Sequence, residues 1–442
     1  MRLHTLLLAA AIGVCTGVSA FAQVGDTQAP PNTAVPGPNP LVTLASEFFD
    51  HDYFNVYAFG DGILDTNNPT LNAAGQTVNT LGTGFDLGGG LNLYHQWRGA
   101  QLSVSYSGAY RQYQNANYDN GTTQSLSVAY NQRLSRHLSM NVFLGAGEFL
   151  YGQTFLTGTA SEGAVVASNP FSPITRYASG GVALTYQQTR RLSYSVTGNI
   201  FLNRYNFPGA IGTTGLAGSG SVNYRVTARD TISASYAHSY FAYQRNAGNA
   251  SADQVGGTWT HSFRNRLSVS VFGGEARSYA TGTVTVPVTL IIDNQAVGGY
   301  VTGTYRQTAY LPSYSGTVSR YFRRSALSVS AGEGIAGSGN GYFLASKSEY
   351  INGLYSYSWR HQNFSASGSW FRISSISNTV SSKYDTALFN ASYGRNLMRF
   401  FGIFLRYSYV RYGALAPLSA THDNQIAFGF NFSSRSVPLT LF

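Results

Sequence analysis

Apolar and polar residues alternate along most of this chain. Between Phe85 and Trp97 every second residue is apolar or compatible with a membrane, and after a short break the alternation resumes with Leu102, Val104 and Tyr106. Successive side chains of a β-strand point to opposite faces, so a period of two gives each face its own kind of residue. The segment therefore predicts a β-hairpin with one apolar and one polar face.

The same hairpin recurs down the chain, with a tight turn on one side and a longer loop rich in Gly, Asn and Ser on the other. Later copies are centred on Val222 and Ile232, Trp259 and Leu267, Val318 and Leu327, Leu354 and Phe364, and Phe389 and Ile403. With a first strand near residues 54–62 and a last one over 425–432, the pattern predicts about 18 strands, within a range of about 16 to 20.

The count is least secure over residues 280–312. Residues 283–292 and 297–308 could form a long inward-folded loop or two further strands. Pro287 argues against a regular strand in the first of these segments, because proline cannot donate a hydrogen bond to a neighbouring strand.

The polar positions indicate where this sheet lies. A soluble sandwich or propeller also alternates, but it would normally carry Lys and Glu on its solvent face. Here the polar residues are small and uncharged, as in Ser193, Ser195, Thr197 and Asn199. Each apolar face is about 10 residues long, which is what a tilted strand needs to cross a bilayer. The predicted fold is all-β: a transmembrane, antiparallel, up-and-down β-barrel.

Composition supports the same fold. Charged residues are 10% of the chain, against about 25% in an average soluble domain. Beyond the first residues no stretch offers the roughly 18 consecutive apolar residues of a transmembrane helix. Aromatic residues gather toward strand ends, as at Tyr57, Tyr94 and Trp97, where they would form girdles at the two membrane interfaces or simply reflect high strand propensity.

The two ends of the chain differ from the barrel. A basic start, a short apolar run and Ala20-Phe21-Ala22 predict a cleaved signal peptide; acylation of Cys15 is the alternative. Five prolines then predict an extended periplasmic leader. The expected organisation is a signal peptide over 1–22, the leader over 23–52, the barrel over 53–432, and a tail or irregular last strand over 433–442.

The net charge of +10 is concentrated in arginines at the eight predicted tight turns. Short turns of such barrels face the periplasm, so these arginines would form a ring against anionic phospholipid headgroups. They lie singly or in pairs and not in one patch, so we expect no nucleic-acid binding. The members of this basic ring are Arg98, Arg136, Arg191, Arg229, Arg266, Arg324, Arg360 and Arg399.

With these features together, the chain resembles bacterial outer-membrane β-barrels of the porin-like kind, without pointing to a subfamily. Such barrels end on an aromatic residue, as this chain does at Phe442, but Pro438 interrupts the last ten residues. The resemblance implies the cell outer membrane of a Gram-negative bacterium, assembly by the barrel assembly machinery, and contact with lipopolysaccharide. Porin-type trimers are common among such proteins, so a homotrimer is one assembly that the resemblance implies for this chain.

The leading functional hypothesis is a channel for small hydrophilic solutes, because a barrel of this size can hold an aqueous lumen. Arg111, Arg225 and Arg406 fall in the lumen phase, and Asp86 is a rare acid there. These arginines would favour anions, unless they only brace loops.

The second hypothesis is a conduit for saccharide uptake or polysaccharide export. It is motivated by lumen-phase aromatics, which could offer sugars an apolar surface or pack against an inward-folded loop: Tyr94, Phe143, Phe371 and Phe404.

A receptor or a membrane-embedded hydrolase is a third hypothesis. The hydrolase would need a histidine with Ser or Asp near one rim, and the spacing around His238 and His261 is that of ordinary strand residues, so we expect no enzyme activity, cofactor or metal. Glu148, Glu275 and Glu333 are predicted to face outward near the outer rim, where they could bind divalent cations with lipopolysaccharide or pair with loops.

Overall fold

The computed structural model describes most of the predicted barrel. The described residues are 53–71, 77–114, 120–150, 174–205, 212–244, 247–263, 266–292, 295–336, 346–375, 383–412 and 421–434. The predicted signal peptide, the leader and residues 435–442 of the predicted tail lie outside them.

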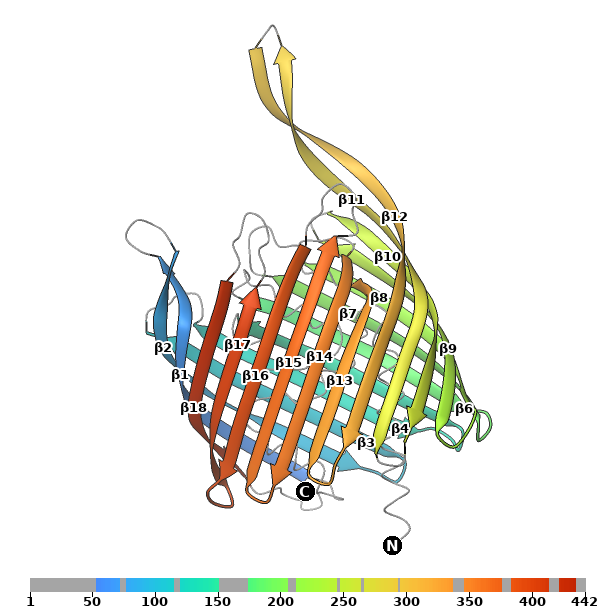
Figure 1. Ribbon diagram of the computed structural model, residues 1–442, viewed down its shortest axis with the longest axis vertical. Coiled ribbons are helices and arrows are strands. Elements are labelled where there is room, and N and C mark those ends of the chain that lie inside the picture. The colour runs from blue at the N-terminus through green and yellow to red at the C-terminus, as the bar shows by residue number, and fades with distance from the viewer. Residues whose placement is uncertain are drawn as a thin grey trace.

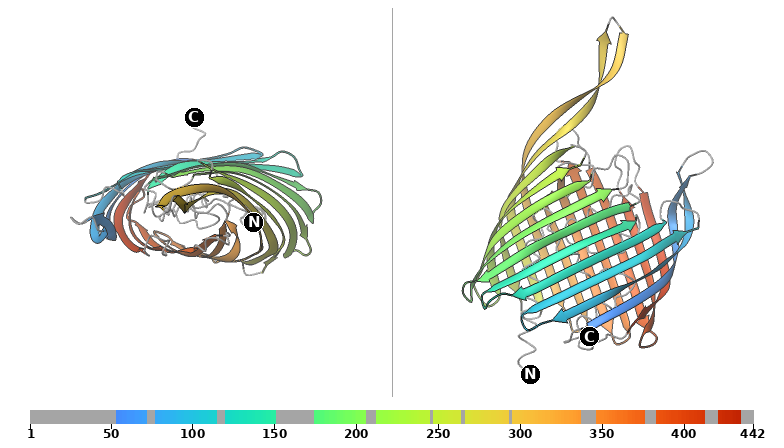
Figure 2. Two further views of the ribbon diagram at one scale, coloured as in Figure 1. Left: turned by 90° about the horizontal axis from the view of Figure 1, so that it is seen from above. Right: turned by 180° about the vertical axis from the view of Figure 1, so that it is seen from behind.

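The described chain forms one sheet of eighteen antiparallel strands that closes on itself (Figures 1 and 2). Each strand pairs with its neighbours in sequence, and β1 also pairs with β18, so the predicted up-and-down barrel is confirmed. The strands are β1 (Tyr53–Leu71), β2 (Thr77–Gln96), β3 (Ala100–Tyr113), β4 (Gly121–Arg133), β5 (Leu138–Leu150), β6 (Ile174–Gln187), β7 (Leu192–Tyr205), β8 (Thr213–Arg225), β9 (Asp230–Tyr243), β10 (Gly248–Ser262), β11 (Leu267–Ile292), β12 (Gln295–Tyr321), β13 (Ser325–Ala336), β14 (Ser346–Trp359), β15 (Gln362–Ser375), β16 (Lys383–Asn396), β17 (Phe401–Tyr412) and β18 (Thr421–Ser433).

The seam between the first and last strands is a regular ladder. It runs from Tyr57 opposite Ser433 to Asp65 opposite Gln425. Beyond the ladder, the Ser434 amide donates to the Val56 carbonyl at 2.8 Å. Closure satisfies the backbone groups that an open edge would leave unpaired, which is a requirement in hydrocarbon.

The two ends of the barrel are unlike. One end, here called the turn end, carries eight tight turns together with the start of β1 and the end of β18; the other is the loop end. Three turns use the same device: the hydroxyl oxygens of Ser135, Thr189 and Thr227 each accept the backbone N–H groups two and three residues ahead. Short turns place this end in the periplasm.

The longest strands occupy the segment in which the strand count was open. β11 and β12 pair with each other from Leu267 opposite Arg320 to Ile292 opposite Gln295. Residues 280–312 are therefore a continuation of two barrel strands above the loop end, and neither an inward loop nor an extra pair (Figure 1).

Pro287 lies inside this ladder, opposite Tyr300. The prediction that it would prevent a regular strand was therefore wrong. The reason is that β10 last pairs with β11 at Gly282, which leaves β11 an edge strand beyond that point. Edge strands tolerate proline, because their outer N–H groups have no partner strand.

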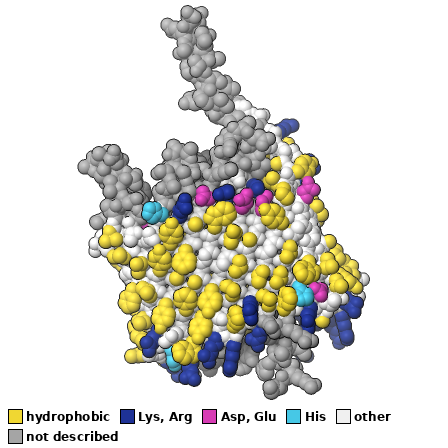
Figure 3. All heavy atoms as spheres, in the orientation of Figure 1, with side chains coloured by type: hydrophobic (Ala, Val, Ile, Leu, Met, Phe, Trp, Pro, Cys, Tyr) yellow, Lys and Arg dark blue, Asp and Glu magenta, His cyan; other side chains and the backbone are white. Residues whose placement is uncertain are grey.

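The outward face of the barrel is apolar. Leu144, Val196, Leu216 and Phe428 are each more than half exposed. On the face seen in Figure 3, apolar side chains cover the middle of the wall, and Lys and Arg gather at the turn end. No helix within the described residues is long and apolar enough to span a membrane. Because an apolar belt on a closed antiparallel barrel is the architecture of outer-membrane proteins, the chain is an outer-membrane β-barrel.

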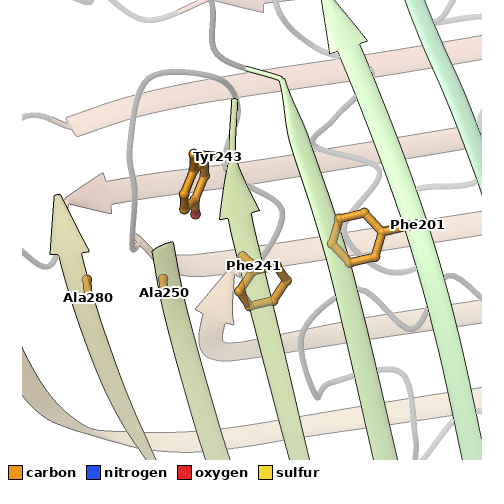
Figure 4. Close-up of a cluster of buried hydrophobic side chains, with 5 residues drawn as sticks. All are labelled: Phe201, Phe241, Tyr243, Ala250 and Ala280. Carbon is orange, nitrogen blue, oxygen red and sulfur yellow. The ribbon is translucent and has the colours of Figure 1, made fainter. Parts of the chain in front are cut away.

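On the inward face, aromatic rings lie across glycines of the neighbouring strand. Phe201 lies opposite Gly215, where an added Cβ would come within 2.1 Å of the ring. Phe143 lies in the same way opposite Gly181. Phe201 also contacts Phe241, with ring centroids 5.7 Å apart, in a buried cluster with Tyr243, Ala250 and Ala280 (Figure 4). Glycine is needed at these positions because the ring takes the space of a side chain.

Replacing Gly215 with alanine should therefore lower the free energy of unfolding by about 1–3 kcal/mol, the usual cost of overpacking. Gly198→Ala is the matched control, because a Cβ added at Gly198 meets nothing within 4 Å. The measurement is urea-induced unfolding of each variant in lipid vesicles. Equal stability of the two variants would contradict the packing of Phe201 on Gly215, as would a failure of Phe201→Ala to rescue Gly215→Ala.

Candidate functional site: the inner wall of the barrel

A group of charged side chains lies on the inner wall formed by β1, β2, β3 and β17. Arg111 donates to both carboxylate oxygens of Asp86, from Nε at 2.8 Å and from Nη2 at 2.7 Å. Arg406 donates from Nη2 to Oδ2 of Asp61 at 2.9 Å, and the same nitrogen is 4.0 Å from Asp86. All four side chains are buried. We call them the lumen charge cluster.

The strand register explains why these charges meet. Asp61 of β1 lies directly opposite Asp86 of β2, and Asp86 lies directly opposite Arg111 of β3. Two carboxylates facing each other across a ladder repel. Arg111 on one side and Arg406 on the other offset that repulsion, so two guanidinium groups flank the pair of carboxylates and hold the cluster together.

The hydrogen-bonded network continues toward the loop end. The Tyr113 hydroxyl donates to Oδ2 of Asp65 at 3.0 Å, and Nε2 of Gln425 donates to the same oxygen at 2.9 Å. This adds a third carboxylate to the same wall. The sequence interpretation had placed one acid, Asp86, in the lumen and had missed Asp61 and Asp65. Both follow from the alternation of β1, since they share the inward phase of Tyr57.

These contacts change the predicted role of the lumen arginines. Arg111 and Arg406 do lie on the inner wall, but each is bound to a carboxylate. With Asp61, Asp65 and Asp86 beside two guanidinium groups, the cluster supplies no net positive charge to attract anions. Arg225, at the turn end of β8, is exposed and forms no ion pair with any described residue.

A second part of the inner wall, over β6 to β9, is nearly free of charge. Among the described inward positions of these strands Arg225 is the one charged residue, and the others are mostly Ser, Thr, Asn and small apolar residues. Ser195 and Ser221 hydrogen-bond each other at 2.7 Å. Oδ1 of Asn199, Nδ2 of Asn203 and Oγ1 of Thr213 are buried without a hydrogen-bond partner. Because buried polar atoms are usually paired, these atoms suggest a polar group that is not part of the described chain.

The predicted lumen aromatics also lie inside the barrel. Phe143, Phe371 and Phe404 are buried, and Tyr94 is half-buried, with its hydroxyl 3.3 Å from Oε1 of Gln96. Phe143 lies flat on the wall over Gly181. Packing therefore accounts for Phe143, and it is not a free apolar surface for sugars.

The histidines singled out in the sequence face outward. Nδ1 of His238 is 2.8 Å from Oδ1 of Asp253, and that oxygen also accepts the Tyr236 hydroxyl at 2.8 Å. Ser239, next in sequence, points to the opposite face and is buried in the interior. Within the described chain, no group of three or more His, Cys, Asp or Glu is placed to hold a metal.

Two of the three outward glutamates are engaged with cations near the loop end. Glu148 pairs with Arg176. Glu333 lies 2.8 Å from Nζ of Lys347, which is also 3.1 Å from Glu349. Glu275 is exposed on the same face. Ion pairing with Arg176 and Lys347 therefore accounts for Glu148 and Glu333 without a divalent cation.

All eight arginines of the basic ring lie at tight turns of the turn end, and all are exposed. Arg266 and Arg360 adopt positive φ values of 57° and 27°, which few non-glycine residues do. Both therefore help to close their turns.

Comparison with known proteins adds little beyond architecture. No family model matches the sequence, and no curated protein matches it. Similar solved structures include OccK5 (OpdH) of Pseudomonas aeruginosa, at 12% identity and a TM-score of 0.40 over 88% of this chain and 99% of that one. A BenF-like porin from Pseudomonas fluorescens Pf-5 has 10% identity and a TM-score of 0.42 over 88% and 100% of the two chains. OpdK of Pseudomonas aeruginosa, solved with vanillate, has 10% identity and a TM-score of 0.39 over 86% and 99%. Similarity at this level does not bear on which solute this chain carries.

Proposed function

We propose that this protein is a passive outer-membrane channel for small hydrophilic solutes. The observation that supports it most is the contrast between the two faces of one closed wall. The outer face is apolar, whereas the inner face carries small hydroxyl and amide side chains along β6 to β9. A wall of eighteen strands is wide enough for an aqueous lumen.

Within this proposal, the solutes are uncharged. An anion-selective channel needs unpaired positive charge along its path. Arg111 and Arg406 do not provide it, because Asp86 and Asp61 bind them. Arg225 remains, but it lies at the turn end, exposed to the periplasmic solution, where salt screens its field.

The test is single-channel recording in a planar bilayer under a potassium chloride gradient. We expect steady conductance steps whose reversal potential shows no preference for anions, because Asp86 and Asp61 offset Arg111 and Arg406 and Asp65 adds a further carboxylate to the same wall. An absence of channels in repeated insertions would refute the channel. Conductance with a strongly anion-selective reversal potential would keep the channel and refute the uncharged class of solute.

A saccharide conduit is a second candidate, favoured by the partnerless polar atoms of Asn199, Asn203 and Thr213 beside the rings of Phe201 and Phe241. Sugars combine hydroxyl groups with apolar faces, and such a wall offers groups for both. Its test is current blockade by a maltooligosaccharide. Blockade that weakens in Asn199→Ala/Asn203→Ala, at unchanged conductance without sugar, supports this candidate, and equal blockade in both proteins rejects it.

A further inference from the structure

A cleft opens at the turn end, between the β2–β3 turn and the end of β4. It has a volume of about 360 Å³ and is lined by Trp97, Arg98, Tyr130, Gln132 and Arg133, with the backbone of the turn. That volume is within the range of small-ligand sites. The lining residues include two arginines and two aromatic residues and no acidic residue.

One wall of the cleft faces the lipid, whereas Arg133, the last residue of β4, has the inward parity of Asn131 and reaches the cleft from the edge of the barrel. Tyr130 lies opposite Leu102, on the apolar side of β3 and β4, and Gln132 lies opposite Ala100 on the same face. Trp97 follows β2 and is 46% exposed. The cleft thus lies where the apolar belt meets the basic ring, at the depth of phospholipid headgroups in the periplasmic leaflet.

Hydrogen bonds hold the walls of the cleft in place. The Trp97 amide donates to the Ala100 carbonyl at 2.8 Å, and the Arg133 amide donates to the Gly99 carbonyl at 2.7 Å. The Arg133 guanidinium donates from Nε to the Ser135 carbonyl at 3.3 Å and from Nη2 to the Arg136 carbonyl at 3.2 Å. The ring of Trp97 meets the rings of His95 and Tyr130 edge-on, with centroids at 4.2 Å and 6.5 Å.

The chemistry of the lining fits a phosphate ester. Guanidinium groups bind phosphate oxygens through parallel N–H bonds, and indole and phenol rings prefer the headgroup region of a bilayer. Arg133 keeps N–H groups beyond the two that its turn uses, and Arg98 is exposed at the same cleft. The cleft therefore combines basic and aromatic residues at the edge of the lipid-facing wall.

We propose that this cleft binds the phosphate headgroup of one anionic phospholipid from the periplasmic leaflet. Arg229 of the basic ring is differently placed. It is followed at once by Asp230, whose carboxylate accepts the Thr227 hydroxyl at 2.6 Å. The inference concerns the outer face of the barrel and is independent of the channel proposed above.

Native mass spectrometry of the purified protein in detergent tests the proposal, with phosphatidylglycerol as the probe and phosphatidylcholine as the zwitterionic reference. We expect one phosphatidylglycerol to be retained by the protein. Its affinity should fall roughly tenfold in Arg98→Gln/Arg133→Gln, and should not change in the matched control Arg229→Gln. A difference in gel migration between unboiled and boiled samples, compared across variants, verifies that each has folded.

Three results would overturn the inference. Equal losses in the double variant and in Arg229→Gln would assign the binding to the basic ring as a whole. Equal retention of phosphatidylcholine would remove the role of the anionic headgroup. Displacement of the lipid by millimolar inorganic phosphate would identify a site for free phosphate. If the double variant does not fold, Arg98→Lys replaces it, and a loss of affinity is expected there because lysine keeps the charge but not the planar pair of donors.

Discussion

Replacing Arg111 with methionine should lower the free energy of unfolding by about 3–5 kcal/mol, the cost of removing one partner of a buried ion pair. The Arg111 side chain is 0% exposed and that of Asp86 is 4% exposed. Methionine fills much of the same volume, so the main effect is an uncompensated carboxylate in the wall. Arg406, at 4.0 Å from Asp86, offsets part of this cost and places the expected value toward the lower end. Urea-induced unfolding in vesicles, followed by tryptophan fluorescence, measures it.

Two comparisons separate this effect from general damage. Arg176→Met breaks a pair with Glu148 in which the arginine side chain is 66% exposed, so its expected cost is about 0–1 kcal/mol. Adding Asp86→Asn to Arg111→Met should recover most of the lost stability, because the uncompensated charge is then gone. If Arg111→Met and Arg176→Met cost the same, or if Asp86→Asn brings no recovery, the lumen charge cluster does not stabilise the barrel as described.

Which residues of each strand face lipid and which face the interior could be predicted from the sequence, because successive side chains alternate between the two faces. Once Leu126 and Val128 are assigned to lipid, the inward position of Ser127 follows, and the structure buries it. In the same way Arg111, Arg406 and Phe143 were assigned to the interior, where they are found. The tight turns could also be predicted from the sequence, since each interrupts the alternation with arginine or other polar residues.

The alternation does not show which inward side chains contact one another. Asp61 and Arg406 are 345 positions apart in sequence. They meet only because the barrel closes between β1 and β18 in one register, and a shift of that register would separate them. The paired state of the lumen arginines, on which the proposal of uncharged solutes rests, therefore required the fold.

The extension of β11 and β12 was hidden for a different reason. Residues 283–290 alternate Thr or Pro with Val or Leu, so the period of two is present, but it does not show that the segment prolongs the strand before it. Pro287 then suggested an interruption, because the sequence does not reveal that β10 ends before it. The contact of Phe201 with Gly215 could not be predicted either, because it depends on which residues of β7 and β8 lie opposite each other.

Exchanging Val196 for arginine should cost about 2–3 kcal/mol of stability in vesicles, whereas Thr197→Arg should cost less than about 1 kcal/mol. Val196 is 60% exposed on the outward face of β7, and an arginine there has to enter hydrocarbon, at a cost that is largest at the bilayer midplane. Thr197 is the next residue on the same strand and points inward, where it forms no hydrogen bond with a described side chain. An arginine at that position meets the polar inner wall.

This pair of variants distinguishes the membrane barrel from a soluble β-sheet with the same alternation. In a soluble sheet, a valine as exposed as Val196 faces water, and arginine would be tolerated there within about 0.5 kcal/mol. The inward Thr197 would then be the sensitive position, because an arginine would be forced into the core. Unfolding of both variants in vesicles of the same lipid therefore gives opposite orders for the two architectures. Greater loss at Thr197 than at Val196 would reverse the assignment of lipid and lumen faces on β7, and with it the polar inner wall on which the proposed channel rests.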